Sequence, residues 1–260
     1  MRTIVTMMAV CLLITIGSPD ANAQRKKKAT SSNPNTKAYT LQGQYTKLEV
    51  KSAFDVVVSD TVKTAIVTLP ARLHNKVVLE IEDDELTIRL KGQHKLKERP
   101  QVILPYNARL SKVELSAASS FTTPMGLNND EVKVDIGGAS RFEGNLSGKK
   151  VEIELSGTSW FHGKVEAGML EYDSKGASQA LITGSVFMTL DIEMSEASKL
   201  DAKNFTAKKV RGFLGGASSA VVQCTESLRV NLTNASTLTY IGTPREVNCP
   251  TDALSRVFCK

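Results

Sequence analysis

Histidine, tryptophan and cysteine are scarce in this chain of 260 residues, which has 3 His, 1 Trp and 4 Cys. The histidines His74, His94 and His162 lie on distant segments, and no Ser-His-Asp arrangement is visible. There is no phosphate-binding loop and no left-handed hexapeptide repeat. The cysteines lack the spacing of a metal knuckle and have no histidine nearby. These absences exclude the common hydrolase, nucleotide-binding and zinc-binding signatures.

Long hydrophobic runs are also absent, apart from one that extends from Ile4 to Ile16. This run follows a single arginine and precedes residues 21–23, which form an Ala-x-Ala cleavage site. It is too short to span a membrane in the mature protein. We therefore expect a signal peptide at residues 1–23 and an exported protein, in the periplasm, on the outer-membrane surface or outside the cell. Cys11 leaves lipoprotein processing open as an alternative.

Excess positive charge is concentrated near the N-terminus. The formal net charge is +6, and residues 25–28, Arg-Lys-Lys-Lys, supply four of these charges. The remainder is close to neutral, which argues against a nucleic-acid-binding face. Residues 24–40 have no apolar periodicity and are predicted to form a disordered basic and polar tether. The basic run could contact an anionic envelope surface, but a solvated charge run is the simpler interpretation.

One short phrase recurs seven times in the chain, with serines 18 to 21 residues apart. A period of this length is typical of a solenoid, in which each repeat buries its apolar side against its neighbours. The copies are Ala118-Ser119, Ala139-Ser140, Thr158-Ser159, Ala177-Ser178, Ala197-Ser198, Ala217-Ser218 and Ala235-Ser236.

Apolar and charged residues alternate just before each serine, as in residues 132–136 and 151–155. This period of two predicts a strand with one buried face. A second apolar column lies two residues after each serine and includes Phe121, Phe142 and Phe161. The Gly-Ala-Ser phrase between the columns is then a corner, and the stacked serines have a structural role. The sequence predicts an all-β parallel β-helix of seven to eight coils, with about 20 residues per coil.

The repeats occupy residues 111–260, and a degraded eighth copy at residues 254–257 is expected within a C-terminal cap. Cys249 and Cys259 flank this copy and are a possible disulfide, which leaves one thiol of the mature chain over. Residues 41–110 are also rich in predicted strands but lack the phrase. They are expected to form an N-terminal β-rich cap that packs continuously against the first coil.

Several of these segments together resemble the head GIN domain family, which is described as putative autotransporter adhesin heads. The resemblance rests on residues 45–58, 85–90 and 240–244 and on the Gly-Ala-Ser repeats, and it covers nearly all of the mature chain. It implies a right-handed parallel β-helix related in shape to pectin lyases, an envelope or surface location in a Gram-negative bacterium, and a role in adhesion. It carries over no catalytic residues. Thr158 and Glu196 depart from the usual repeat pattern.

Two outward columns of charge precede the serines. The column five residues before each serine holds five consecutive carboxylates, and the column seven residues before is acidic only in its middle. Like charges on paired strands cost up to about 1 kcal/mol per pair, so screening by water and salt, a bound Ca²⁺ or a basic partner must compensate. The acidic centre consists of Glu152, Glu154, Glu171, Asp173, Asp191 and Glu193.

Trp160 lies between a corner serine and the buried Phe161, so its side chain is predicted to point outward. An exposed indole can stack on a sugar or a partner, or it can pack under a neighbouring side chain. Trp160 and His162 are the candidate glycan-binding residues.

The sequence therefore predicts an exported, noncatalytic interaction module that binds a glycan or a surface protein. Ca²⁺ is the one candidate cofactor, no nucleic acid is expected, and the oligomeric state is undefined. An alternative is a lyase-like, polysaccharide-processing enzyme in which the acidic centre holds a cation and Arg211 abstracts a proton. Arginine is a poor base near neutral pH, which disfavours this alternative. A purely structural envelope component is the third possibility.

Overall fold

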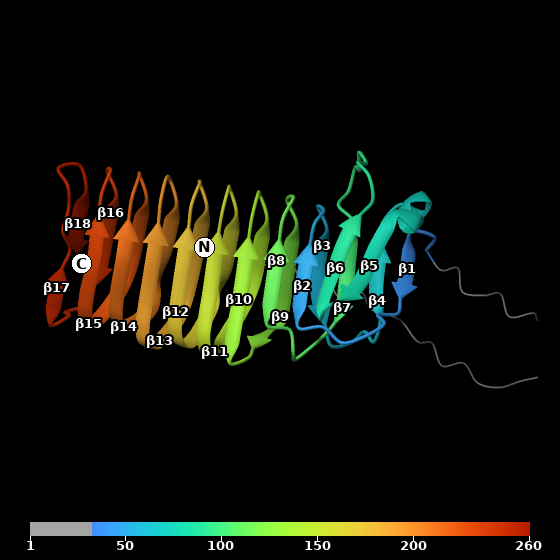
Figure 1. Ribbon diagram of the computed structural model, residues 1–260, viewed down its shortest axis with the longest axis horizontal. Helices are drawn as coiled ribbons and strands as arrows, with labels where there is room; N and C mark the ends of the chain where they lie inside the picture. The colour runs from blue at the N-terminus through green and yellow to red at the C-terminus, as the bar shows by residue number, and fades with distance from the viewer. Residues whose placement is uncertain (1–32) are drawn as a thin grey trace, which may run out of the picture. The chain divides into compact units, whose positions relative to one another are not determined.

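The computed structural model describes residues 33–260, and nearly all of their regular structure is β. The strands form a β-solenoid of about eight turns, with about 19 residues per turn. Figure 1 shows these coils stacked side by side. The predicted parallel β-helix is therefore confirmed. The predicted signal peptide and most of the predicted tether lie outside the described residues.

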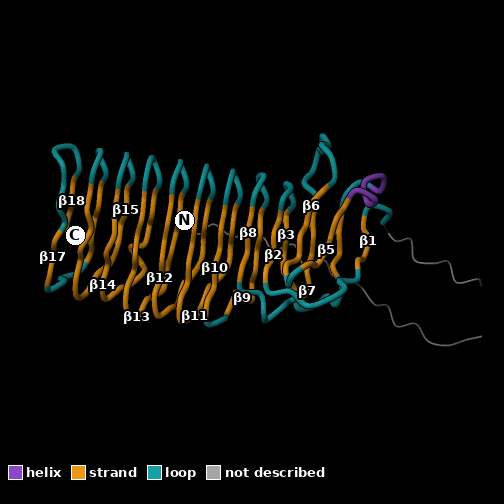
Figure 2. The backbone as a smooth tube through the Cα atoms, in the orientation of Figure 1, coloured by secondary structure: helices purple, strands orange, loops and turns teal. Residues whose placement is uncertain are grey.

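Each coil of the repeat region has one strand segment before the serine corner and one after it. Between Arg141 and Leu232, the segment after one corner and the segment before the next are joined into a single long strand (Figure 2). The strands are β8 (Lys112–Leu115), β9 (Ser120–Asn128), β10 (Glu131–Ile136), β11 (Arg141–Leu155), β12 (Trp160–Ser174), β13 (Gln179–Met194), β14 (Lys199–Leu214), β15 (Ser219–Leu232), β16 (Thr237–Ile241), β17 (Glu246–Asn248) and β18 (Arg256–Cys259).

Successive coils pair in parallel and in register, so equivalent side chains lie above one another. Val134 is paired with Ile153, and Phe142 is paired with Phe161. The ring centroids of Phe121 and Phe142 are 5.5 Å apart, and those of Phe142 and Phe161 are 5.4 Å apart, so the three rings form a stacked ladder. All three rings are fully buried. The two apolar columns predicted from the sequence thus meet in one continuous core inside the coils.

The serines of the repeated phrase are buried at the corners, including Ser255 of the degraded copy. Ser236 donates a hydrogen bond from Oγ to the Leu214 carbonyl at 3.0 Å, and its Oγ lies 3.4 Å from Ser255 Oγ. These contacts support a structural role for the serine column. Two residues before each of the first seven serines the backbone φ is positive, at Ala117, Gly138, Gly157, Gly176, Glu196, Gly216 and Asn234.

The N-terminal segment contributes coils of its own. β2 (Lys47–Val50) pairs in parallel with β8, and β3 (Asp55–Ser59) pairs in parallel with β9. On their other side, β2 pairs with β6 (Glu85–Leu90) and β3 pairs with β7 (Gln101–Pro105). The coil made by β2 and β3 therefore lies between two coils that follow it in the sequence. It continues the core of the repeats without a break.

Antiparallel strands complete this end of the stack. β5 (Val77–Glu82) pairs with β6, and β4 (Ala65–Thr68) pairs with β7. The short 3-10 helix η1 (Ala71–Lys76) connects β4 to β5. These elements cover the outermost coil, which would otherwise expose an unpaired edge.

One part of the predicted tether is ordered, which corrects that prediction. β1 (Thr36–Tyr39) pairs with β4 in antiparallel register. Thr36 Oγ1 lies 3.2 Å from Thr68 Oγ1, and the Tyr39 hydroxyl lies 3.1 Å from His74 Nδ1. These contacts with β4 and η1 stabilise a segment that has no apolar periodicity of its own.

Candidate functional site

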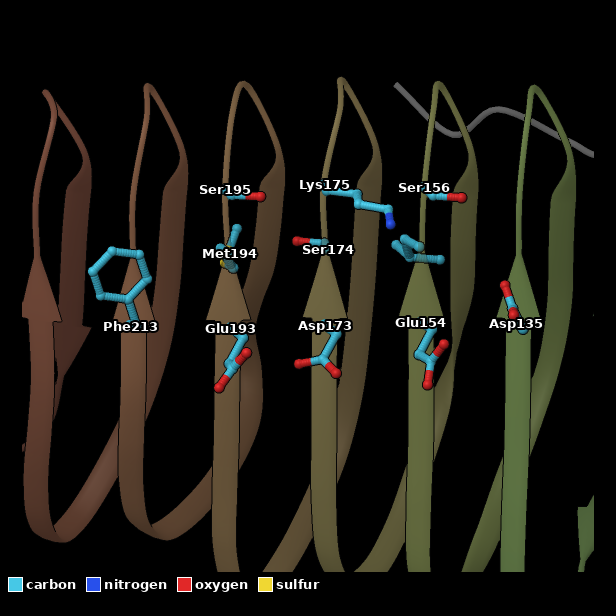
Figure 3. Close-up of a pocket in the computed structure, with 11 residues that line it drawn as sticks. Asp135, Glu154, Ser156, Asp173, Ser174, Lys175, Glu193, Met194, Ser195 and Phe213 are labelled. Carbon is cyan, nitrogen blue, oxygen red and sulfur yellow. The ribbon is translucent and has the colours of Figure 1, made fainter.

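The outer surface of the strands that precede the corners forms the first candidate site, and we name it the acidic face. Its carboxylates lie in register on neighbouring strands, and Figure 3 shows four of them in a row with Phe213 on the next strand. Glu49 on β2 extends the row, although its segment lacks the repeated phrase. The complete row is Glu49, Glu114, Asp135, Glu154, Asp173 and Glu193.

Basic side chains neutralise much of the acidic centre. Lys133 Nζ lies 2.5 Å from Glu152 Oε1 and also contacts Glu154. Both carboxylates raise the pKa of Lys133, against the opposing effect of burial. In addition, Glu171 and Asp191 pair with Lys150 and Arg211, each at 2.7 Å. Lysine and arginine side chains of neighbouring coils therefore supply compensation that the sequence analysis assigned to solvent, a cation or a partner.

Asp173 and Glu193 have no salt bridge among the described residues. Burial, together with repulsion from Glu193 and Glu154, raises the pKa of Asp173 to about 6. Both side chains line a shallow cleft of about 560 Å³, together with Lys175 and Phe213 (Figure 3). The cleft is the least compensated part of the acidic face.

The expected Ca²⁺ site is not assembled by these side chains. Within residues 33–260, no group of three His, Cys, Asp or Glu side chains is placed so that it could hold a metal ion. Ca²⁺ requires six to eight oxygen ligands at about 2.3 to 2.6 Å. In the acidic centre four of the six carboxylates instead contact a basic side chain.

The outer surface of the strands that follow the corners is the second candidate site, and we name it the tryptophan face. Trp160 is half-buried, and its ring centroid lies 5.3 Å from that of His162 with an interplanar angle of 53°. The structure thus brings together the two residues that the sequence singled out. On the adjoining strands, Trp160 is paired with Arg141 and with Gln179.

Two hollows flank the Trp160–His162 pair. Trp160 lines a hollow of about 240 Å³ whose rim includes Arg141, Thr158 and Gln179. His162 lines a second hollow of about 380 Å³. The other residues of the second hollow are Thr122, Thr123, Pro124, Glu143, Gly144, Asn145, Gly163, Lys164 and Thr183. The lining therefore combines an indole, an imidazole and several hydrogen-bonding groups.

Two glycines that line the second hollow allow neighbouring coils to pack closely. A Cβ on Gly163 would lie 1.9 Å from the Gly144 carbonyl oxygen, and a Cβ on Gly144 would lie 2.5 Å from Thr123 Cγ2. A side chain at either position would require its neighbour to shift. The sequence analysis identified Trp160 and His162 but missed these glycines, because they lie outside the repeated phrase.

The remaining sequence predictions concern the cysteines and the membrane. Cys224, Cys249 and Cys259 are free thiols in the structure, so the Cys249–Cys259 disulfide is not formed there. Burial raises the pKa of the Cys224 and Cys249 thiols. In the part of the chain that the structure describes, no helix is long and apolar enough to cross a bilayer.

Solved structures from species of Parabacteroides share this fold. A putative adhesin from Parabacteroides distasonis ATCC 8503 is 22% identical, covers 86% of this chain and 93% of its own, and has a TM-score of 0.72. A putative adhesin from Parabacteroides merdae ATCC 43184 is 19% identical, covers 86% of this chain and 95% of its own, and has a TM-score of 0.75. A putative lipid binding protein from Parabacteroides distasonis ATCC 8503 is 17% identical, covers 88% of this chain and 98% of its own, and has a TM-score of 0.73. These identities show a shared fold alone.

A search of curated proteins gave no match. By contrast, the family model described as "Putative auto-transporter adhesin, head GIN domain" matches residues 44–244. This range includes the coils of the N-terminal segment and both candidate faces. The chain therefore belongs to the head GIN domain family of putative auto-transporter adhesins.

Proposed function

We propose that this protein is an exported, noncatalytic adhesion module that binds glycans on its tryptophan face. Its membership of a family of putative adhesins supports an adhesion-like role at a surface. The observation that carries the glycan proposal is the Trp160–His162 pair between two polar hollows. Sugars combine apolar ring faces with many hydroxyl groups, and an indole beside hydrogen-bonding side chains matches both properties.

The acidic face favours this proposal over a lyase-like enzyme. Arg211, the candidate base of that alternative, donates from Nε to Asp191 Oδ2 at 2.8 Å. The candidate base is therefore held by a carboxylate of the same surface. The grouping of carboxylates that a catalytic cation would require is also missing from residues 33–260.

Trp160 makes the proposal directly measurable, because it is the only tryptophan of the chain. Intrinsic fluorescence therefore reports on the candidate site alone. We expect a glycan that binds to shift or quench the Trp160 emission in a saturable manner. By isothermal calorimetry, Trp160→Ala should weaken binding of the same glycan at least about 10-fold, since aromatic anchors typically contribute more than 1 kcal/mol.

Phe213→Ala is the matched control, because Phe213 is an exposed aromatic residue on the acidic face. This variant should retain full glycan affinity. Chromatography of the glycan after long incubation should show no shortened or unsaturated product. Saturable binding that survives Trp160→Ala would reject the tryptophan face, and release of product would favour the enzyme.

A further inference from the structure

Arg141 is the basic residue closest in register to Trp160. The two residues are directly paired on neighbouring strands, where side chains on the same face lie about 4.8 Å apart. Arg141 is exposed and lines the same hollow as Trp160 and Gln179. Its guanidinium is therefore available to a ligand that contacts the indole.

Asp55, the carboxylate two strands away from Arg141 in the same register, is bound to other side chains. Asp55 Oδ1 accepts hydrogen bonds from Ser120 Oγ at 2.7 Å and from Arg99 Nη1 at 3.1 Å. Ser120 occupies the position between Asp55 and Arg141 on the intervening strand. Within residues 33–260, no salt bridge involves Arg141. Its guanidinium is thus not held in an ion pair by the described residues.

Lys199, on the other side of Trp160, is a second basic residue without a salt bridge among the described residues. It is exposed and pairs in register with Gln179. Asp201, the acidic residue nearest to it along the strand, instead contacts Lys203 at 3.1 Å. The row Arg141, Trp160, Gln179 and Lys199 thus places an indole and an amide between two cations about 14 Å apart, which is three strand spacings.

This row has the chemistry of an anionic sugar site. A guanidinium presents a planar fork that binds a carboxylate through two parallel hydrogen bonds, and the adjacent indole can stack on the apolar face of the same sugar ring. Resting on the glycan-binding function above, we propose that the tryptophan face selects acidic glycans and that Arg141 binds the carboxylate of a uronate residue. Lys199 adds a second, longer-range attraction for the next charge along the chain.

The test compares uronate trisaccharides with their methyl esters, which differ in charge and scarcely in shape. We expect the acidic trisaccharide to quench Trp160 emission with a Kd at least about 10-fold lower than that of the ester at low salt. The ratio should shrink as salt is added. Arg141→Gln should remove the preference for the acid, so that acid and ester bind this variant with the same affinity.

Arg211→Gln provides the matched control, because Arg211 lies on the acidic face and is paired with Asp191. It should leave the ratio unchanged. Equal affinity for acid and ester, or a preference that persists in Arg141→Gln, would overturn the inference while leaving the glycan-binding function intact. Failure of a broad panel of acidic, sulfated and neutral glycans to alter Trp160 emission would overturn the glycan-binding function itself.

Discussion

The acidic face and the tryptophan face are built from the same coils, yet their charges are arranged differently. On the acidic face, basic side chains from adjoining coils contact Glu152, Glu154, Glu171 and Asp191. On the tryptophan face, Arg141 has no such partner among the described residues. A dense column of carboxylates can therefore be largely neutralised by basic side chains of the protein itself. A cation without an ion pair, beside an indole, is the better indication of a ligand-binding site.

The strongest test of this comparison separates the tryptophan face from the core beneath it. Trp160 and Phe161 are neighbours in sequence, but Phe161 is fully buried in the aromatic ladder. Phe161→Ala should reduce the free energy of unfolding by about 3–5 kcal/mol, because it leaves a cavity in a packed core. Trp160→Ala should change it far less. Urea unfolding followed by circular dichroism measures both, and equal losses would show that Trp160 is a core residue.

A smaller effect tests the compensation on the acidic face. Lys133→Ala leaves Glu152 and Glu154 without their shared cation and should lower stability by about 1 kcal/mol at low salt. Added salt should reduce this loss, since it screens the repulsion. Lys149→Ala is the control, because the ion pair between Lys149 and Asp130 is exposed to solvent. This variant should leave the unfolding midpoint unchanged. A salt-independent loss in Lys133→Ala would instead indicate lost packing.

The smallest effect concerns the pH response of the cleft. Burial and repulsion raise the pKa of Asp173 from an ordinary value of 3.8 to about 6 in the folded protein. Between these values the folded state binds more protons than the unfolded state, so stability falls as pH rises through this window. Asp173→Asn should flatten that slope and raise stability at pH 7 by less than about 1 kcal/mol, allowing for solvent screening.

Urea midpoints measured from pH 4 to pH 7.5 check the Asp173 prediction. Asp130→Asn is a suitable control, because Asp130 is highly exposed between β9 and β10 and does not line the cleft. It should leave the slope between pH 4 and 6 as it is in the parent protein. Parallel pH profiles for the parent and Asp173→Asn would contradict the raised pKa.

Local patterns predicted the repeat region because each coil obeys the same rules. The period of two before each serine placed Val134 and Ile153 inside, and the small residues of the phrase placed the corners. The N-terminal segment was less predictable. There β2 lies between β8 and β6, and this order depends on pairing between strands that are distant in sequence.

The candidate site also has features that the sequence predicted and features that only the structure showed. Trp160 was identified from its position beside a corner, since alternation along a strand decides which side chains point outward. The repeat register places Arg141 and Gln179 at the positions equivalent to Trp160 in the adjoining coils. The hollow beside Trp160 and the lack of a salt bridge to Arg141 among the described residues were not visible in the sequence. Likewise, Lys133 could be assigned to Glu152 and Glu154 only when the coils were placed side by side.

By itself, the sequence determined the coil, its corners, its buried columns and the outward direction of Trp160. These features follow from steric limits at each corner and from the alternation of side chains along a strand, which are properties of a few consecutive residues. Only the tertiary structure decided the order of the N-terminal coils, the partners of the carboxylates and the hollows beside Trp160. Each of these depends on the register between strands, which is set by packing across the whole stack.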